Sequence, residues 1–594
     1  MLFGKHINKY YLKYAPVLLL GLAALILVDY FQLKVPEIYR MVINGINTGE
    51  VHINGEILPF DINFLLDKIC LPLIIIIAVM VVGRFLWRVC FFGSAIKVET
   101  DVREKMFKRS LLLSQSYYQV NKVGNLMSLY TNDLETVQEC FGSGILALCD
   151  ALFLGGLTVV KMFKMDYILT LLALIPMALM AVCGIIVGRQ MTRKWEKRQA
   201  AFSDLSDFSQ ESFSGISVIK AFVKEFKELM AFRWLNKKNE KVNVEYTKAS
   251  TLLNVAVTFL VESVICIILG YGGYLVYKGV FDAGRLVEYI GYFTALVWPV
   301  MAVAQLIEMT SRGRASLKRI SEHLDTEIDV CDKPNVRYLK DIRGDIEFKH
   351  LTFRYPQAKC NALCDVTFSI SAGENAGIVG KAGAGKTTLV DLILRTYNVP
   401  DGTLFIDGED VNGIAVDCVR SAAAYVPQDN FLFSDTIENN ITFSLDCKDL
   451  SAEAERGARL ACVHENIAEF KDKYKTVLGE RGVTVSGGQK QRISIARALV
   501  KDAPILILDD SVSAVDTKTE RTILQNLKKT RSGRTTIIIA HRISTVEKLD
   551  KIIYMEEGKV VAVGKHEQLY ESCPAYRRAV DLQKLEDEGG ENGV

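Results

Sequence analysis

A chain of 594 residues is long enough for several domains. Half of its residues are hydrophobic and its mean hydropathy is positive, so part of the chain is expected to lie in lipid. The formal net charge of +2 gives no indication of a nucleic-acid partner. The 13 cysteines form neither a CxxC pair nor a Cys/His cluster at metal spacing, and we interpret them as buried thiols kept reduced in the cytoplasm.

Six long apolar stretches fill the first 310 or so residues, approximately at 16–36, 70–92, 141–163, 167–188, 251–278 and 286–310. A helix needs about 20 apolar residues to cross roughly 30 Å of hydrocarbon, and each stretch is long enough. The sequence therefore predicts a membrane domain over 1–325, all-α, with six spanning helices.

Loop charges predict the orientation of these helices. The connection 41–67 contains no lysine or arginine, whereas 97–122 and 189–248 are rich in both. The positive-inside rule places those two loops and both ends of the chain in the cytoplasm. The first 16 residues are too polar, and the apolar run behind them too long, for a cleavable signal peptide. We expect an integral multi-pass membrane protein, with a bacterial inner membrane as the best match.

The composition changes after a polar, proline-containing linker at 326–343. From Gly344 the run "GDIEFKHLTFRYP" alternates like a strand, and "NAGIVG" and "APILILDD" have the composition of buried strands with helical segments between them. This pattern predicts an α/β domain over 344–582. The acidic, glycine-rich tail 583–594 is expected to be disordered.

Two segments of the α/β domain predict a site for ATP and Mg²⁺. "GKAGAGKTT" (380–388) matches the P-loop pattern between a strand-like run and a helix-like run, where backbone N–H groups and a helix N-terminus bind phosphate. "ILILDD" ends a second strand, so Asp509 is expected to hold Mg²⁺ as a Walker-B aspartate. The predicted phosphate-binding residues are Gly380, Gly383, Gly385, Lys386, Thr387 and Thr388, with Thr387 also on Mg²⁺.

A further motif, "VSGGQKQRISIARAL" (485–499), resembles the signature of ATP-binding cassette proteins. The resemblance implies an adenine-stacking role for Tyr355, a sensor of Mg²⁺ and water at Gln428, and a γ-phosphate contact at His541. In that family the signature faces the P-loop of the other subunit in a dimer. The residues with this implied role are Ser486, Gly487, Gly488 and Gln489, together with Asp516 of the D-loop.

The resemblance extends into the membrane half. The stretches 117–137 and 211–225 look like the cytoplasmic coupling extensions of type-IV exporters, and "ALVWPVMAVAQL" is similar to their sixth helix. It implies alternating access driven by ATP, with an amphipathic drug or lipid as the default cargo and a peptide as an open alternative. Six spanning stretches exclude a soluble cassette ATPase, whereas an ATP-gated channel or a regulatory protein on the same fold stays open.

Asp510 departs from the family pattern, in which the residue after the Walker-B aspartate is a glutamate that acts as general base. Aspartate reaches about 1.5 Å less, and a misplacement of about 1 Å costs on the order of a hundredfold in rate. In exporters made of two different halves, one subunit combines an aspartate here with an intact signature, as this chain does, while its partner combines a glutamate with a damaged signature. We therefore expect a heterodimer whose partner supplies the glutamate. The alternatives are a homodimer using Asp510 as a slow base, or compensation by backbone or water.

Ionisable residues at membrane depth are functional candidates, since they face a cavity or pair with one another. Those in or near the predicted helices are Asp29, Arg84, Arg88, Asp150, Glu262 and Glu308. For the arginines and Glu308 we favour structural pairing or snorkelling to the interface. Glu262 is the preferred candidate for an acid that faces a cavity, against an equally weighted structural role.

Overall fold

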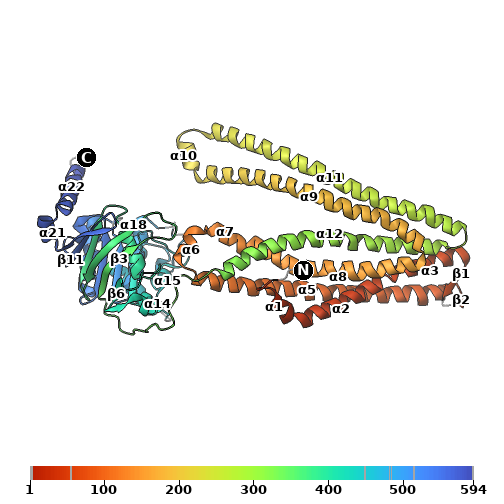
Figure 1. Ribbon diagram of the computed structural model, residues 1–594, viewed down its shortest axis with the longest axis horizontal. Coiled ribbons are helices and arrows are strands. Elements are labelled where there is room, and N and C mark those ends of the chain that lie inside the picture. Colours follow the sequence, from red (N-terminus) through yellow and green to blue (C-terminus); the bar gives the residue numbers. More distant parts are fainter. Residues whose placement is uncertain are drawn as a thin grey trace. The chain divides into compact units, whose positions relative to one another are not determined.

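Figure 1 shows the computed structural model, which describes residues 4–53, 56–446, 450–479, 482, 485–512 and 515–591, and leaves out the side chains of 52–57, 181–189, 192 and 586–591. The chain divides into two compact units. The first contains Met1–Leu111 and Val123–Thr326, and the second contains Leu112–Lys122 and Glu327–Val594.

The first unit consists of long helices, with one short hairpin of β1 (Glu50–Ile53) and β2 (Glu56–Pro59). Its helices are α1 (Asn8–Lys13), α2 (Ala15–Gln32), α3 (Val35–Thr48), α4 (Ile62–Phe64), the π-helix η1 (Leu65–Cys70), α5 (Leu71–Leu112), α7 (Val123–Ser128), the π-helix η2 (Leu129–Asp133), α8 (Leu134–Met165), α9 (Tyr167–Ser214), α10 (Ile216–Ala221), α11 (Glu225–Tyr277) and α12 (Ala283–Asp325). α9 and α11 run side by side, and α12 packs along α8 and α3 (Figure 1).

Five segments of this unit are long and apolar enough to cross a membrane: Ala15–Thr48, Ile62–Leu112, Val123–Met165, Glu225–Tyr277 and Ala283–Asp325. α9 is equally long, but its described apolar part, Tyr167–Met180, is shorter than a span. Over the described residues the count of six therefore stays a prediction. α11 has 53 residues, far more than the roughly 20 that a bilayer needs, so a large part of it extends beyond the hydrocarbon.

The second unit contains two sheets. The antiparallel sheet has the order β4-β3-β6-β7, with β3 (Ile346–Phe353), β4 (Leu363–Ile370), β6 (Leu404–Ile406) and β7 (Glu409–Asp410). The larger sheet has the order β12-β11-β5-β10-β9-β8, with β5 (Asn375–Gly380), β8 (Ala423–Val426), β9 (Ile505–Asp509), β10 (Thr535–Ala540), β11 (Lys551–Glu556) and β12 (Lys559–Gly564). Among the described strands of this sheet, only the β11–β12 pairing is antiparallel.

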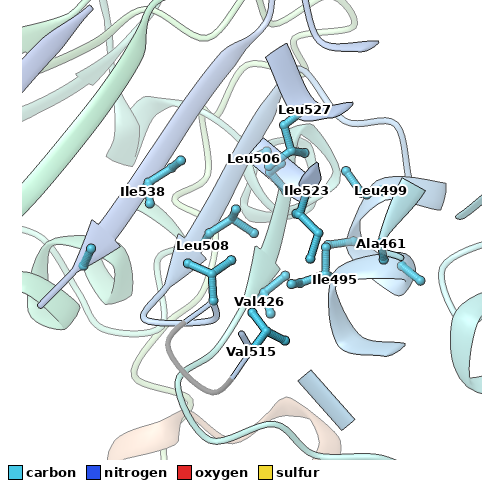
Figure 2. Close-up of a cluster of buried hydrophobic side chains, with 14 of the residues drawn as sticks. Val426, Ala461, Ile495, Leu499, Leu506, Leu508, Val515, Ile523, Leu527 and Ile538 are labelled. Atoms are coloured by element: carbon cyan, nitrogen blue, oxygen red, sulfur yellow. The ribbon is translucent and has the colours of Figure 1, made fainter. Parts of the chain in front are cut away.

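Helices cover these sheets: α6 (Gln115–Val120), α13 (Lys386–Ile393), α14 (Val416–Ala422), α15 (Ile437–Ile441), α16 (Ser451–Leu460), α17 (His464–Ala468), α18 (Gly487–Val500), α19 (Thr517–Thr530), α20 (Ile543–Val546), α21 (His566–Ser572) and α22 (Pro574–Glu591), with the 3₁₀ turns η3 (Val411–Gly413) and η4 (Lys473–Lys475). All five residues of β9 are buried, as expected for a central parallel strand covered on both faces. Figure 2 shows one side of this core, where Leu506 and Leu508 of β9 meet Ile495 of α18 and Ile523 of α19.

Two segments of the structure differ from the domain boundaries predicted from the sequence. Residues 112–122, with α6, group with the nucleotide unit, where the Ser114 and Ser116 hydroxyls donate to Asp329 at 3.0 and 2.8 Å. α22 also continues through Glu591, so the backbone of 583–591 is helical where the sequence predicts disorder. The segment "LQKLEDE" consists mostly of strong helix formers, and the helix before it is anchored in the core.

Candidate functional site

The predicted nucleotide residues follow adjacent parallel strands. β5 leads into the P-loop, β10 ends just before His541, β9 ends in Asp509 and Asp510, and β8 precedes Gln428. These strands are neighbours in the order β5-β10-β9-β8, so their carboxyl ends meet at one edge of the sheet. In open parallel sheets ligands bind at this edge. The structure thus brings the P-loop, Gln428, Asp509, Asp510 and His541 to one edge; Gln428 and His541 are exposed there.

The P-loop requires glycine at three positions. Gly383 and Gly385 have φ values of +79° and +92°, which L side chains rarely adopt. At Gly380 a Cβ would lie 2.2 Å from the Met555 carbonyl oxygen of β11, and at Gly385 it would lie 2.9 Å from the Ala362 carbonyl oxygen. The glycine spacing therefore reflects both backbone conformation and the close approach of neighbouring chain segments.

Lys386 begins α13 and is only 6% exposed. Its ammonium donates to the carbonyl oxygens of Gly380 and Lys381 at 2.8 and 3.0 Å. Burial lowers the pKa of Lys386, while the nearby carboxyl groups of Asp509 and Asp510 oppose the shift. The positive charge thus lies within the loop whose glycines shape a phosphate site.

Asp509 is 1% exposed, and its Oδ2 has no hydrogen-bond partner among the described residues. The Thr387 and Tyr425 hydroxyl groups lie near its carboxyl group, and the Thr387 hydroxyl opposes the rise in the pKa of Asp509. Burial raises the pKa of Asp509, and the neighbouring Asp510 adds to that shift. A carboxylate oxygen without a donor beside the Thr387 hydroxyl is an oxygen donor set that fits Mg²⁺.

Asp510 is fixed by its backbone. Its φ is +45°, an uncommon value for a residue with a side chain. Its N–H donates to the Ile539 carbonyl of β10 at 2.9 Å, and its carbonyl accepts from the Gln491 amide of α18 at 3.2 Å. The position of Asp510 is therefore determined by two neighbouring elements, which leaves little freedom to compensate for a short side chain.

Tyr355 has contacts that its predicted adenine-stacking role did not include. Its hydroxyl donates to Thr388 Oγ1 at 3.0 Å and to Asp391 Oδ2 at 3.1 Å, and its ring packs edge-on against Phe353 and Tyr397. Asp391 was missed by the motif search, although it lies on α13 one turn after Thr387 and Thr388. Stacking on adenine stays a prediction; the contacts attach the Tyr355 loop to the P-loop helix.

The signature serine begins α18. Ser486 Oγ accepts from the Gln489 N–H at 3.3 Å, and Gln489 Oε1 accepts from the Ser486 N–H at 2.9 Å, which is a capping box. Gly487 and Gly488 form the first turn, so their amides point out of the helix end. Asp516 caps α19 in the same way, through the Thr519 N–H at 2.9 Å. The "GERG" residues 480–481 and the D-loop residues 513–514 lie outside the described residues.

The ionisable residues of the membrane unit divide into buried and exposed groups. Asp29 of α2 and Asp150 of α8 are buried and interact electrostatically, and the Trp298 indole donates to Asp150 Oδ2 at 2.8 Å. Glu262 and Glu308 are exposed in the single chain. Arg84 donates to Gln32 at 3.3 Å. The preference for Glu262 thus has no contact to support it, and the buried pair is the more unusual feature.

Comparison with known proteins agrees with this geometry. Residues 18–300 match the ABC transporter transmembrane region and residues 363–513 match the ABC transporter family. The chain is 34% identical to the probable multidrug resistance ABC transporter ATP-binding/permease protein YheI of Bacillus subtilis over 99% of this chain and 98% of the relative. It is 34% identical to the multidrug resistance-like ATP-binding protein MdlA of Escherichia coli, over 96% and 95% of the two chains.

A solved structure of a bacterial Atm1-family ABC exporter with ATP bound superposes with a TM-score of 0.75 at 25% identity, covering 97% of this chain and 98% of the other. The ATP-dependent lipid A-core flippase of Syntrophus aciditrophicus is 33% identical over 88% of this chain and 86% of that protein. With a membrane unit followed by one nucleotide-binding domain, this multi-pass membrane protein belongs to the ABC transporter family, as an exporter half-transporter with a transport ATPase domain.

Proposed function

We propose that the chain exports amphipathic drugs or lipids by alternating access, as one half of a heterodimer to which it contributes the slower ATP site. The cargo class follows from relatives named as multidrug resistance proteins and a lipid A-core flippase. The observation that carries the unequal sites is Asp510, which stands where the family has a glutamate while the rest of the site is intact. Bacterial relatives support an inner-membrane location, with the nucleotide-binding domain and both termini in the cytoplasm.

We assign the following roles to the predicted site residues. The P-loop amides and Lys386 bind the phosphates, Tyr355 stacks on adenine, and Thr387, Asp509 and Gln428 hold Mg²⁺, which when bound offsets negative charge on the phosphate oxygens. Asp510 polarises the attacking water weakly, because its backbone is fixed and its side chain is one methylene short. His541 contacts the γ-phosphate.

The second ATP site of the proposed dimer uses the signature and D-loop residues of this chain. Ser486, Gly487, Gly488, Gln489 and Asp516 lie at two capped helix N-termini, where free backbone amides favour an anion. They complete a competent site against the partner's P-loop and glutamate. Among the described residues no hydrogen bond joins this group to the chain's own P-loop, in keeping with a role across a dimer.

The test is steady-state ATP hydrolysis by the purified chain in lipid, beside Asp510→Asn, Asp510→Glu and the exposed control Asp472→Asn. We expect the wild type to bind ATP but turn it over slowly, and Asp510→Glu to raise turnover by about tenfold or more. Steady turnover by the wild type that Asp510→Asn abolishes would instead establish a homodimer with Asp510 as base. The intact capping box at Ser486 also agrees with that second candidate, since two copies would each supply a whole signature.

A further inference from the structure

The helix α22 presents one face to the nucleotide domain. Tyr576, Val580 and Gln583 are spaced by four and three residues, so they lie on the same side of the helix. Tyr576 and Val580 are buried in the core, and the Tyr576 hydroxyl is hydrogen-bonded to His566 Nδ1 at 2.8 Å. These contacts fix the first half of α22, and Gln583 continues the same face one turn later.

Gln583 makes two hydrogen bonds to the loop that contains His541. Its Nε2 donates to the His541 carbonyl oxygen at 2.6 Å, and its Oε1 accepts from the Ile543 N–H at 2.8 Å. One amide group therefore spans the backbone on both sides of Arg542, much as a neighbouring strand would. A glutamine is suited to this because it carries a donor and an acceptor at its end.

The loop has few other constraints on this side. A cavity of about 330 Å³ lies between it and α22, lined by His541, Arg542, Ser544, Glu547, His566 and Lys584 in addition to Gln583. Side chains around an open space of that size do not hold a backbone by close packing. The buried Ile543 side chain and the hydrogen bond from Thr545 to Glu520 hold α20, and the two hydrogen bonds from Gln583 add an attachment to α22 at the backbone of His541 and Ile543.

We propose that Gln583 is a positioning residue for the γ-phosphate contact: it holds the backbone at His541 and Ile543 so that the imidazole of His541 faces the nucleotide. This rests on the proposed role of His541. It makes the C-terminal helix part of the nucleotide site, because any movement of α22 at Gln583 moves the backbone that carries His541. ADP lacks the γ-phosphate, so the effect of Gln583 is confined to ATP.

The first test is amide hydrogen exchange of the full chain in lipid nanodiscs. Ile543 N–H is protected by Gln583, so Gln583→Leu should speed its exchange by about tenfold, as the loss of one hydrogen bond allows. Leu582→Ala, at the exposed neighbouring position, is the matched control and should leave it unchanged. Unchanged exchange at Ile543 in Gln583→Leu, with α22 still protected, would overturn the proposal.

The second test measures the affinity of a non-hydrolysable ATP analogue and of ADP, which needs no turnover. Gln583→Leu should weaken binding of the analogue by about three- to tenfold and leave the affinity for ADP unchanged. His541→Ala should have the same two effects. Gln583→Glu should recover part of its affinity for the analogue relative to wild type as pH falls from about 8 to about 5, because the protonated carboxyl, which begins to form as pH approaches about 4.3, can donate as well as accept. A purely structural role would instead change the affinities for the analogue and for ADP alike.

The two proposals fail in different ways. If His541→Ala weakens the analogue and Gln583→Leu does not, the positioning role of Gln583 is wrong while His541 keeps its role. If neither variant changes the ratio of analogue to ADP affinity, the proposed role of His541 is wrong and the inference built on it falls too.

Discussion

The two halves of the chain satisfy buried charge by different means. In the nucleotide half, Arg395 donates to the carbonyl oxygens of Val411 and Ile414 at 3.3 and 3.1 Å, and Arg531 donates to those of Ala503 and Pro504 at 2.9 and 3.1 Å. In the membrane half, the example is a buried carboxyl group, Asp133, and its partners are side chains of another helix. The Arg319 guanidinium and the Ser316 hydroxyl, both on α12, donate to Asp133.

This difference follows from the sign of the buried charge, since a carboxylate needs donors and a guanidinium needs acceptors, and from secondary structure. Within a helix each carbonyl already accepts an N–H four residues later, so a bundle of long helices has few free carbonyls for a buried cation. An α/β domain has loops at every strand end, where carbonyl oxygens are free. Buried charge in the membrane half therefore depends on side-chain partners, and removing one partner leaves the other group unsatisfied.

In the described part of the chain, each half also contains one buried carboxyl group with an oxygen atom that lacks a hydrogen-bond donor. Asp509 Oδ2 and Asp29 Oδ2 are the two buried carboxyl oxygens, among the described residues, for which no hydrogen-bond donor is found. At Asp509 the free oxygen lies at the site that the motifs predict for Mg²⁺. Asp29 likewise has a buried carboxyl oxygen without a donor, although no sequence motif includes this residue.

Replacing a structural arginine of the nucleotide half should have the largest effect. Arg395 is 2% exposed, so Arg395→Met leaves the Ile414 carbonyl oxygen without its donor and the Val411 carbonyl oxygen with only the Ile414 N–H at 3.4 Å, and should lower the free energy of unfolding by about 3 kcal/mol. Chemical unfolding of the full chain, followed by amide exchange in β9, measures it. Arg521→Met, at an exposed position on α19, should change stability by less than about 0.5 kcal/mol. Equal effects of the two variants would refute the importance of the carbonyl contacts.

Replacing Lys386, a buried cation proposed to bind the ligand, should affect ligand binding and not stability. Lys386→Ala should weaken ATP binding by about 10- to 100-fold, as expected for a lost hydrogen bond to a charged group, while the apo protein keeps its stability. Equilibrium binding of a fluorescent ATP analogue measures it. Lys381→Ala, in the same loop but exposed, is the control. A large loss of apo stability in Lys386→Ala would place this lysine with the structural arginines.

Asp509 gives a prediction about pH. Burial raises its pKa above the ordinary carboxyl value of 3.8, so the folded domain binds this proton more tightly than the unfolded chain does. The ionised carboxylate therefore costs stability at neutral pH, and the cost fades as pH falls through the raised pKa. Asp509→Asn should stabilise the apo domain at pH 7 by about 1 kcal/mol, with a gain that shrinks on acidification, and should abolish stabilisation by MgATP. Calorimetry of the full chain with and without MgATP measures both; a destabilised apo variant would contradict the assignment.

The accuracy of sequence-based prediction also differs between the halves. That the P-loop, Asp509 and His541 lie together could be predicted, because the motifs place them after strands and the parallel sheet brings those strand ends together; their roles stay predictions. The contacts of Asp391 and Gln583 could not be predicted, since each is made at a distance along the chain that no short motif spans.

In the membrane half, hydropathy predicted the helices but not their partners. Asp29 and Glu262 look alike in the sequence, each an acid in an apolar run, yet Asp29 is buried between helices and Glu262 is exposed. Which face of a helix is covered depends on tertiary packing. Because α11 is apolar around much of its spanning part, the spacing of its apolar residues did not indicate which side of the helix is buried.

The smallest expected effect tests the unsatisfied acid of the membrane half. Asp29→Leu removes a buried oxygen that has no donor, so it should leave stability unchanged or raise it by about 1 kcal/mol. Asp133→Leu is the matched control, because it removes an equally buried acid and leaves Arg319 and Ser316 without their acceptor, and it should destabilise the protein. Thermal unfolding in detergent micelles compares the two. A stabilised Asp29→Leu protein that no longer transports dye into inverted vesicles would show that this carboxyl group is kept for function, as at Asp509. A destabilised one would mean that Asp29 is held by contacts like those of Asp133, and the parallel with Asp509 would end there.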